Sequence, residues 1–220
     1  MLCESFCESF PALDAIPQVR AGFMRRVPGL DMRVARELAL ERLRAAHDDG
    51  REAAGFSGMV FATAEQVHGS AVAGVSADTT FPVPSADGLL TTRPGICLGI
   101  YVADCAAVFL ADRLGRGIAL VHSGKKGTEQ GIAPAAVAAL CHAASVDPSD
   151  LVAQISPCIR PPHYETDFAA EIRRQLASVG VRAVHDCGTC TASHPKSYYS
   201  YRREKGLTGR MLAVLAIREP

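Results

Sequence analysis

The chain has 220 residues, of which 48% are apolar and 21% are charged, a composition typical of a globular protein. Its 23 basic and 23 acidic residues give a formal net charge of zero, and no long cluster of like charges occurs. This balance argues against binding to nucleic acid or to a charged membrane surface. No stretch has the composition of a linker, so we expect a single domain.

The N-terminus lacks a cationic segment followed by an apolar run, so it does not resemble a signal peptide. The most apolar stretch, residues 96–111, is too short to span a membrane and contains Asp104. We therefore expect a cytoplasmic protein without a membrane partner. The eight cysteines of such a chain are expected to be mainly reduced, as buried apolar groups or as metal ligands.

The first part of the chain divides into an irregular segment and a helix. Residues 1–19 show no clear periodicity, and we expect this N-terminal segment to be partly disordered, with the domain running from 20 to 220. Apolar residues recur at helical spacing over 31–46, with most charged residues on the other face. Residues 50–58 then have the composition of a loop.

The middle of the chain is dominated by predicted strands. A strand over 59–67 leads into a turn at His68, and a short strand over 71–75 follows. Two nearly continuous apolar runs, 95–112 and 116–122, are rich in Val, Ile and Leu. Such runs are typical of strands that are covered on both faces of a sheet.

Helices and strands alternate in the remainder of the chain. The Ala-rich segment 128–144 places its larger apolar residues on one helical face, with Pro134 in the first turns, where proline is tolerated. A second amphipathic helix over 166–179 ends at Gly180. Strands are predicted at 151–155, 181–184 and 212–217. The alternation predicts an α/β or α+β layered domain.

Three segments in the middle of the chain each offer one metal-binding side chain: His68, Cys105 and His122. Two imidazoles and one thiolate suit zinc, and three protein ligands leave the fourth position open, as in catalytic zinc sites. Asp104 lies within an apolar run, where an unpartnered acid carries a desolvation cost. We expect it to orient one of the histidines. The prediction is a metal site that the fold must assemble.

The same residues permit other interpretations. A buried cysteine is most often a small core residue, and an isolated histidine is usually a hydrogen-bonded structural one. Cys105 with His68 or His122 as the base would also suit a Cys–His hydrolase. A C-x-x-C pair, Cys187 and Cys190, would suit a redox pair or half of a zinc site. It lacks a second half site, and no helix start follows it to lower a thiol pKa.

Basic residues follow the second of these histidines. Lys125 and Lys126 lie in a glycine-flanked segment before the Ala-rich helix, which suits an anion site made by backbone amides and the helix dipole. The spacing is not that of a Walker A loop, and a solvated turn with two surface lysines is an equal alternative. Five arginines near the chain ends would extend such a site or serve as surface charge. They are Arg25, Arg26, Arg202, Arg203 and Arg210.

Eight short motifs follow one another from about Phe61 to the C-terminus. They are Gln66-Val67-His68-Gly69, Ala86-Asp87-Gly88, Ala103-Asp104-Cys105, His122-Ser123-Gly124, Ser156-Pro157-Cys158-Ile159, Cys190-Thr191, Ser200-Tyr201-Arg202-Arg203 and Thr208-Gly209-Arg210. In this order the chain resembles the laccase-domain family, whose members have been described as polyphenol oxidases and as purine nucleoside phosphorylases.

The resemblance implies a mixed β-sandwich flanked by helices, with a zinc or copper ion held by His68, Cys105 and His122. It also implies a small-molecule substrate, because family members are described as phosphorolysing adenosine, inosine and methylthioadenosine and as deaminating adenosine. Others are credited with phenol oxidation or with editing misincorporated serine in peptidoglycan precursors. We expect a zinc-dependent purine nucleoside enzyme with Asp104 as a further catalytic residue.

The chain departs from the family pattern after the second histidine. The family typically reads His-Ala-Gly-Trp-Arg-Gly, whereas this chain reads His122-Ser123-Gly124-Lys125-Lys126-Gly127. An aromatic ring and a guanidinium are thus replaced by two ammonium groups, which hold an anion only as point charges. We expect Lys125, Lys126 and Arg26 to hold phosphate. The change affects the expected substrate more than the metal.

Three alternative functions are also compatible with the sequence. One is a Cys–His hydrolase or amidase that edits peptidoglycan precursors, and another is a copper-dependent polyphenol oxidase. The third is a binding protein that keeps the metal site without turnover. Seven histidines, most of them outside the motifs, argue against full laccase chemistry, which uses several copper ions.

Overall fold

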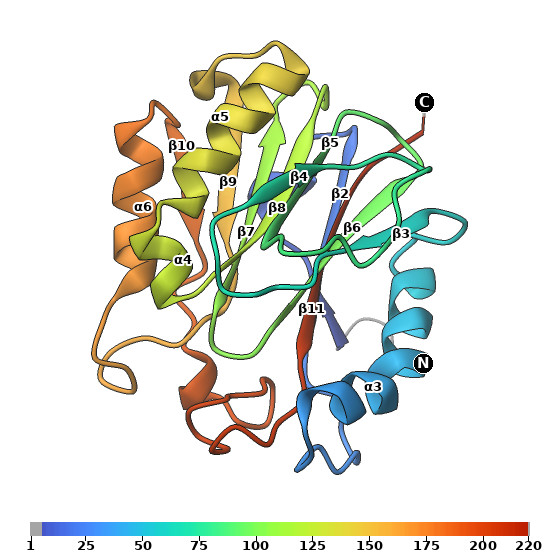
Figure 1. The fold of residues 1–220 in the computed structure, drawn as a ribbon, viewed down its shortest axis with the longest axis vertical. Helices are drawn as coiled ribbons and strands as arrows, with labels where there is room; N and C mark the ends of the chain where they lie inside the picture. The colour runs from blue at the N-terminus through green and yellow to red at the C-terminus, as the bar shows by residue number, and fades with distance from the viewer. Residues whose placement is uncertain (1–5, 220) are drawn as a thin grey trace.

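Two mixed β-sheets pack face to face in the computed structural model, which describes residues 6–219 (Figure 1). Within these residues the first sheet has the strand order β1-β2-β11-β6-β3. Its strands are β1 (Cys7–Glu8), β2 (Val19–Met24), β11 (Met211–Ile217), β6 (Ile96–Val102) and β3 (Val60–Thr63). The β3–β6 pair is parallel, whereas the other pairs of this sheet are antiparallel.

The second sheet has the order β10-β9-β7-β8-β5-β4 within the described residues. Its strands are β10 (Ala183–Asp186), β9 (Leu151–Ile155), β7 (Ala106–Asp112), β8 (Ile118–Ser123), β5 (Gly88–Thr91) and β4 (Val72–Gly74). The two edge pairs are parallel and the inner pairs are antiparallel. This confirms the expected α+β class and the mixed β-sandwich in a single domain.

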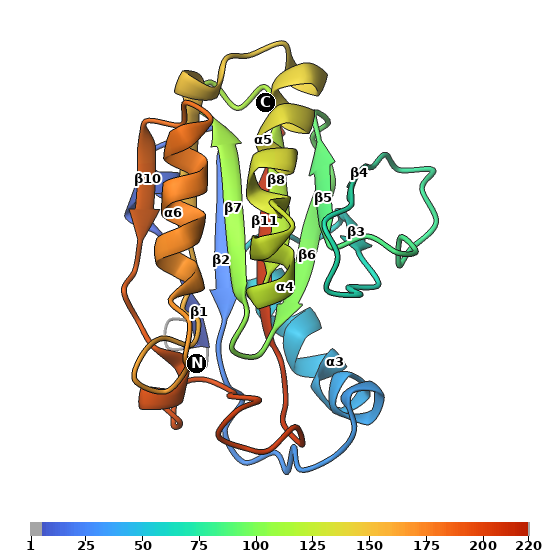
Figure 2. The ribbon, with the colours of Figure 1, turned by 60° about the vertical axis from the view of Figure 1, so that its left-hand side comes forward.

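Helices cover the outside of the sandwich. The α5 and α6 helices lie across the outer face of the second sheet (Figure 2), with α4 at their lower end. The α3 helix packs beside the first sheet. The helices are α2 (Pro11–Asp14), α3 (Arg36–Ala53), α4 (Lys125–Glu129), α5 (Ile132–Ala144) and α6 (Phe168–Ser178), with the short 3-10 turns η1 (Pro148–Asp150) and η2 (Thr191–Ser193).

Every residue of β7 is buried, as expected for an apolar strand covered on both faces. Phe109 and Ala111 point into the core between the two sheets, and Val108 and Leu110 point to the core under the helices. This alternation follows from the two-residue period of a strand. The strand next to the site is therefore fixed by apolar packing on both sides.

The N-terminal segment is folded where the structure describes it. In residues 6–19, Phe10, Leu13 and Ile16 are buried in the inter-sheet core. The expectation of partial disorder is therefore wrong for residues 6–19, because their apolar side chains have partners that the local sequence does not reveal. The rest of the expectation, residues 1–5, lies outside the described residues.

Two predicted helix boundaries shift in the structure. The helix expected at 31–46 begins at Arg36 and continues through Gly50 into the predicted loop. A Cβ at Gly50 would lie 2.8 Å from the Phe6 ring and 3.1 Å from the Met24 sulfur, so glycine there permits close packing. The Ala-rich helix divides into α4 and α5 at Gly131, whose φ of 74° is readily adopted by glycine.

No helix among residues 6–219 is long and apolar enough to cross a membrane.

The apolar run over 95–112 is two strands joined by a turn. The β6 strand ends at Val102, β7 begins at Ala106, and Asp104 takes a φ of 79° between them. The expectation that Asp104 lies inside a strand is therefore wrong. A further strand, β5, which the periodicity did not indicate, follows Asp87 and pairs with β8.

Candidate metal centre

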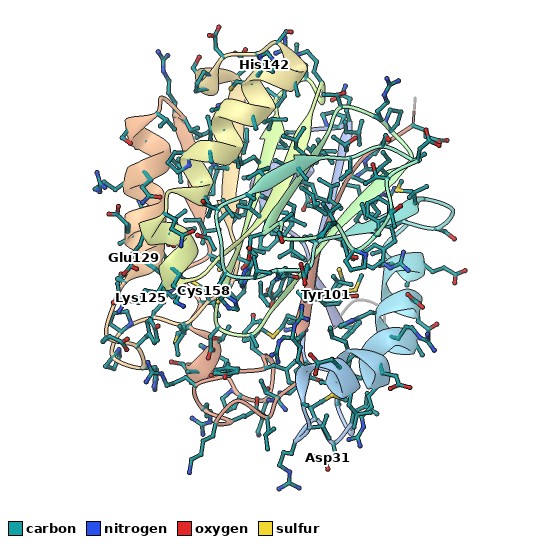
Figure 3. The ribbon with its side chains drawn as sticks, viewed as in Figure 1. Asp31, Tyr101, Lys125, Glu129, His142 and Cys158 are labelled. Atoms are coloured by element: carbon teal, nitrogen blue, oxygen red, sulfur yellow. The ribbon has the colours of Figure 1, made fainter. Side chains whose placement is uncertain are left out.

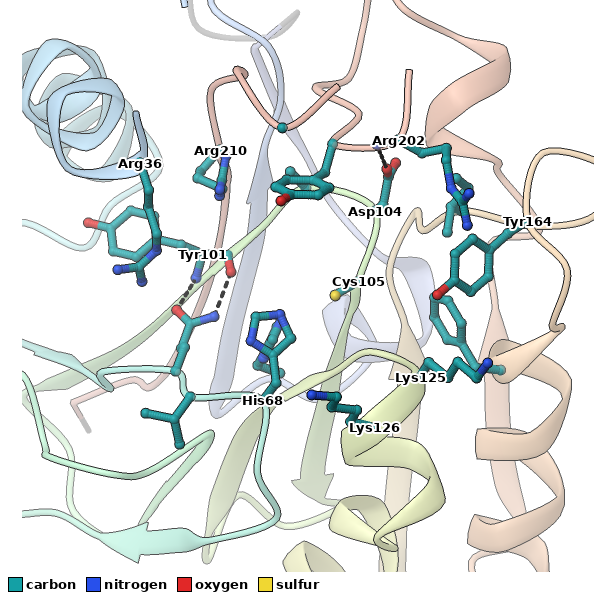
Figure 4. A pocket seen from close by; sticks show the side chains of 18 of the residues that line it. Arg36, His68, Tyr101, Asp104, Cys105, Lys125, Lys126, Tyr164, Arg202 and Arg210 are labelled. Carbon is teal, nitrogen blue, oxygen red and sulfur yellow. Dashed lines mark hydrogen bonds between the residues drawn. The ribbon is translucent and has the colours of Figure 1, made fainter. Parts of the chain in front are cut away.

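The sandwich brings His68, Cys105 and His122 together at one of its ends. Ala107 lies opposite His122 in the antiparallel β7–β8 pair, so the β6–β7 turn carries Cys105 toward the imidazole. The loop after β3 brings His68 to the same place. The metal-binding atoms of the three residues all lie within 4.8 Å of one another. Figure 4 shows His68 and Cys105 facing each other in the pocket.

A buried carboxylate, Asp87, holds both histidines in place. Its Oδ1 lies 2.9 Å from His122 Nδ1, and because the carboxylate can only accept, this nitrogen carries the proton and leaves Nε2 free for a metal. The backbone N–H groups of Val67, His68 and Gly69 also donate to Asp87, at 2.7 to 3.1 Å. Burial raises the pKa of Asp87, but these hydrogen bonds outweigh it and lower the pKa below its ordinary value.

Backbone strain is concentrated around the site. Gln66, His68 and Asp104 have φ values of 63°, 63° and 79°, a region that costs a non-glycine residue about 1–3 kcal/mol. Hydrogen bonds to Asp87 stabilise the conformation at His68. The Gln66 side chain pairs with both backbone groups of Tyr101, at 2.6 and 2.9 Å. The loop is thus tied to the end of β6 in the conformation that presents the imidazole.

Asp104 has a different role from the one expected. Its carboxylate accepts hydrogen bonds from the hydroxyls of Thr191 and Ser200, at 2.6 and 3.0 Å, and from the backbone N–H of Arg202 at 2.7 Å. The prediction that Asp104 orients a histidine is wrong, because Asp87 does so. Asp104 therefore anchors the segment 191–210, here called the C-terminal loop, which forms one wall of the pocket.

Cys105 and His122 shift each other's pKa. Burial raises the pKa of the Cys105 thiol, but the charge and hydrogen bonds of His122 and His68 outweigh it and lower that pKa to about 6. Burial lowers the pKa of His122, whereas Cys105 and Asp87 raise it to about 9. The geometry therefore favours a thiolate, which is the form that binds metals.

The three side chains fit a zinc or copper ion, since imidazole and thiolate suit both. Tetrahedral zinc with ordinary bond lengths spaces its nitrogen and sulfur ligands roughly 3.3–3.6 Å apart, and the donor atoms here lie within 4.8 Å of one another. Gly124 keeps this space open. A Cβ at that position would lie 2.6 Å from Cys105 Sγ and 3.9 Å from His68 Cδ2.

A cavity of about 990 Å³ opens above these three side chains. Figure 3 places Tyr101 and Lys125, which line it, far from His142 at the other end of the molecule. Six basic residues line the cavity, and Asp104 is the acidic residue that lines it among residues 6–219. The basic residues are Arg36, Lys125, Lys126, Arg202, Lys205 and Arg210.

Lys125 and Lys126 line the pocket, but Arg26 does not. The Arg26 guanidinium lies 2.6 Å from Glu204 Oε1 and 4.3 Å from the centre of the Tyr199 ring. The expectation that Arg26 holds phosphate is therefore not met by this structure. The side chain instead stabilises the fold, because an internal carboxylate already satisfies its charge.

Several pocket residues carried no signal in the sequence. Arg36 at the start of α3, Tyr101 at the end of β6 and Tyr164 before α6 come from separate elements, and only tertiary packing places them together. Asp87 did carry a signal, because it stands in the Ala86-Asp87-Gly88 motif that the family resemblance singled out. A buried acid in such a position needs hydrogen-bond partners.

The C-x-x-C pair is not part of a metal cluster among the described residues. Cys187 is exposed, and both Cys187 and Cys190 are free thiols. The backbone around Cys190 is bridged to Cys158, and Thr191 follows directly with its hydroxyl on Asp104. The segment therefore serves to position the loop that carries Thr191.

Comparison with known proteins identifies the family. Residues 30–171 and 162–218 match the family described as multi-copper polyphenol oxidoreductase laccase. This protein belongs to that family. The resemblance inferred from the motifs is thus confirmed, and the matched residues include His68, Cys105 and His122.

Relatives of known name and structure agree with this assignment. A purine nucleoside phosphorylase of Streptomyces coelicolor is 31% identical over 173 residues, which cover 66% of this chain and 70% of the relative. One from Deinococcus radiodurans is 30% identical and covers 75% of this chain and 73% of its own.

Solved structures show the same fold. The crystal structure of YlmD from Geobacillus stearothermophilus superposes with a TM-score of 0.79 at 25% identity, over 98% of this chain and 99% of the other. A DUF152 protein of Neisseria meningitidis reaches 0.83 at 23% identity, over 98% and 100% of the two chains.

Proposed function

We propose that this protein is a metal-dependent purine nucleoside phosphorylase. One observation carries the proposal: a strongly basic cavity opens directly onto the His68, Cys105 and His122 donor set. The names of its relatives point to the same reaction. An excess of basic over acidic side chains favours an anionic reactant, and phosphate is the anionic reactant of phosphorolysis.

The reaction makes demands that this pocket meets. The bond between C1′ of the ribose and the purine nitrogen breaks, and a phosphate oxygen forms a new bond to C1′. The departing base keeps the electron pair of the broken bond and takes up a proton, which gives free base and ribose 1-phosphate. Phosphate must therefore be held beside the sugar while negative charge on the base is stabilised.

Side chains of this chain supply the holding groups. The flexible side chains of Lys125 and Lys126, at the start of α4, line the pocket and attract phosphate, with Lys126 beside His68 and Lys125 nearer Tyr164 (Figure 4). Tyr101 and Tyr164 offer aromatic faces of the kind on which a purine stacks. A metal ion bound by His68, Cys105 and His122 would supply Lewis-acid stabilisation of developing negative charge.

Adenosine deamination by the same site needs a metal but no phosphate. The basic lining favours phosphorolysis, because adenosine is uncharged and gains little from six cations around the cavity. Deamination therefore takes second place among the nucleoside reactions. It is distinguished by its product, inosine, which forms without phosphate.

A Cys–His hydrolase is the second candidate from another class of enzyme. The lowered pKa of Cys105 and its contact with His122 would also suit a nucleophile and its base. The two proposals differ in their response to a chelator. Metal removal abolishes phosphorolysis, whereas it exposes the thiolate of a hydrolase and raises its activity.

The deciding experiment is product analysis by liquid chromatography with zinc-loaded protein. We expect hypoxanthine to form from inosine only when phosphate is present, and Cys105→Ala to remove this activity. Cys187→Ala is the matched control, because Cys187 is exposed and lies outside the cavity. Absence of phosphate-dependent base release by the zinc-loaded and the copper-loaded protein would refute the proposal.

A further inference from the structure

The basic side chains of the pocket form two separate groups. Figure 4 shows Arg36 and Arg210 beside Tyr101, and it shows Lys125 and Arg202 across the cavity beside Tyr164. His68 and Cys105 lie between the two groups in this view. A single phosphate at the donor set would therefore engage the group that contains the lysines. It would leave Arg36 and Arg210, the arginine pair, without a ligand.

The two groups differ in how their charge is neutralised. Arg202 lies 2.8 Å from Glu165 and Lys125 lies 3.9 Å from it, so this carboxylate already balances part of their charge. Among residues 6–219, the Arg36 guanidinium donates to the backbone carbonyl of Glu65, at 3.2 Å. No salt bridge joins Arg36 or Arg210 to an acidic side chain within residues 6–219.

The two arginines are close to each other and partly shielded from water. Burial and then the neighbouring charge of Arg36 lower the pKa of Arg210 below its ordinary value. Arg210 donates to the carbonyls of Thr208 and Gly209, at 2.8 and 2.9 Å, which fix its position. Two adjacent half-buried guanidiniums repel each other unless an anion lies between them. Paired guanidiniums match a phosphate group bidentately.

We propose that Arg36 and Arg210 bind a phosphate group that the nucleoside itself carries, so that the preferred substrate is a purine nucleoside 5′-phosphate. This inference rests on the proposed phosphorolysis. The 5′ position is favoured by geometry. In a nucleoside it lies across the ribose from the base, and in the pocket Arg36 and Arg210 lie away from Cys105 and the lysines. The cavity, at about 990 Å³, is at the upper end of the usual range for ligand sites and has room for a second phosphate.

The reaction balances with one more phosphate on each side. Inorganic phosphate attacks C1′ of the nucleoside 5′-phosphate, the bond from C1′ to the base breaks, and the base leaves with that electron pair and a proton. The products are the free purine and ribose 1,5-bisphosphate. The arginine pair would hold the 5′-phosphate throughout, while Lys126 would hold the attacking phosphate.

The test compares inosine 5′-monophosphate with inosine as substrates of the zinc-loaded protein in the presence of phosphate. We expect kcat/KM to be at least about 10-fold higher for the nucleotide, since charge-assisted hydrogen bonds to phosphate are lost with inosine. Arg36→Gln and Arg210→Gln each remove this preference. Arg33→Gln is the matched control and keeps it, because the Arg33 side chain is 83% exposed.

Two outcomes would overturn the inference and leave the proposed function standing. One is equal or better use of inosine by the unchanged protein. The other is a rise in the KM for inorganic phosphate in Arg36→Gln with inosine as substrate, which would show that the pair holds the co-substrate.

If neither compound is turned over, the proposed function fails and calorimetric titration decides the fate of the arginine site. Binding of inosine 5′-monophosphate that both glutamine variants weaken at least about 10-fold would retain the site for a phosphorylated nucleoside. Absence of inosine 5′-monophosphate binding by the unchanged protein would overturn the arginine site as well. Circular dichroism and the Tm of each variant confirm that it is folded.

Discussion

Two buried carboxylates lie beside the donor set, and they do different work. Asp87 accepts hydrogen bonds from His122 and from the backbone of the His68 loop, so it determines how the imidazoles point. Asp104 is the chain neighbour of Cys105, but its hydrogen bonds run to Thr191 and Ser200 of the C-terminal loop. Adjacency in the sequence therefore did not identify the carboxylate that serves the metal ligands.

The two sides of the site differ in what they hold. The Asp87 side holds donor atoms, and a change there affects the metal. The Asp104 side holds a wall of the pocket, together with the Arg26 and Glu204 pair that lies behind it. Changes on that side should affect stability and substrate binding first.

Asp87→Asn should have the largest effect. An amide NH₂ would replace one carboxylate oxygen and face the N–H groups of the His68 loop, leaving partly buried donors unpaired. We expect metal affinity to fall about 10- to 100-fold and unfolding free energy to fall by about 2–4 kcal/mol. Competition with a chromophoric chelator and urea denaturation measure these. Unchanged metal affinity would show that Asp87 does not support the metal ligands and does not differ from Asp104 in this respect.

The rate of Cys105 alkylation in metal-free protein should depend on Asp87 and not on Asp104. Only the thiolate reacts, so with a pKa of about 6 the rate with iodoacetamide should rise as the pH passes about 6 and level off above it. In Asp87→Asn the midpoint should move to higher pH, because His122 loses the carboxylate that favours its charged form. In Asp104→Asn it should stay. Buried Cys97, whose pKa is raised to about 12, should remain unmodified at neutral pH.

Asp104→Asn should have an intermediate effect of a different kind. The side chain would keep one acceptor oxygen for three donors, so the loop that carries Thr191 and Ser200 should loosen. We expect a loss of about 1–3 kcal/mol in unfolding free energy, with metal affinity within about threefold of the original. A higher KM for the nucleoside substrate would accompany this. Loss of metal as severe as in Asp87→Asn would contradict the proposed division.

Arg26→Gln should have the smallest effect on activity. The side chain is paired with Glu204 and does not line the cavity, so the KM for phosphate should change less than about twofold. Stability should fall by about 1 kcal/mol, because Glu204 loses a partly buried partner. Lys126→Gln is the informative contrast, and there the KM for phosphate should rise about 10-fold or more. Equal effects of the two substitutions would place Arg26 in the site after all.

Much of the fold could be predicted because the local pattern and the final environment agree. The strand at 212–217 is a continuous apolar run, and the one at 151–155 is apolar except for Gln154; both are buried on both faces, as such segments predict. The helix around 166–179 is amphipathic, and its boundaries shift by only one or two residues. Periodicity was misleading where a residue served packing at a distance, as Gly50 does.

The metal donors His68, Cys105 and His122 were predicted from residue type and order, and the structure brings them together. Residue types and their order were enough to predict this donor set and the lysine pair, because chemistry of this kind depends on which side chains are present. The partners of Asp87 and Asp104, and the presence of Arg36 and Arg210 in one cavity, depend on the tertiary structure. These contacts join residues far apart in the chain, and their strength depends on distance and burial, which only packing of the two sheets sets.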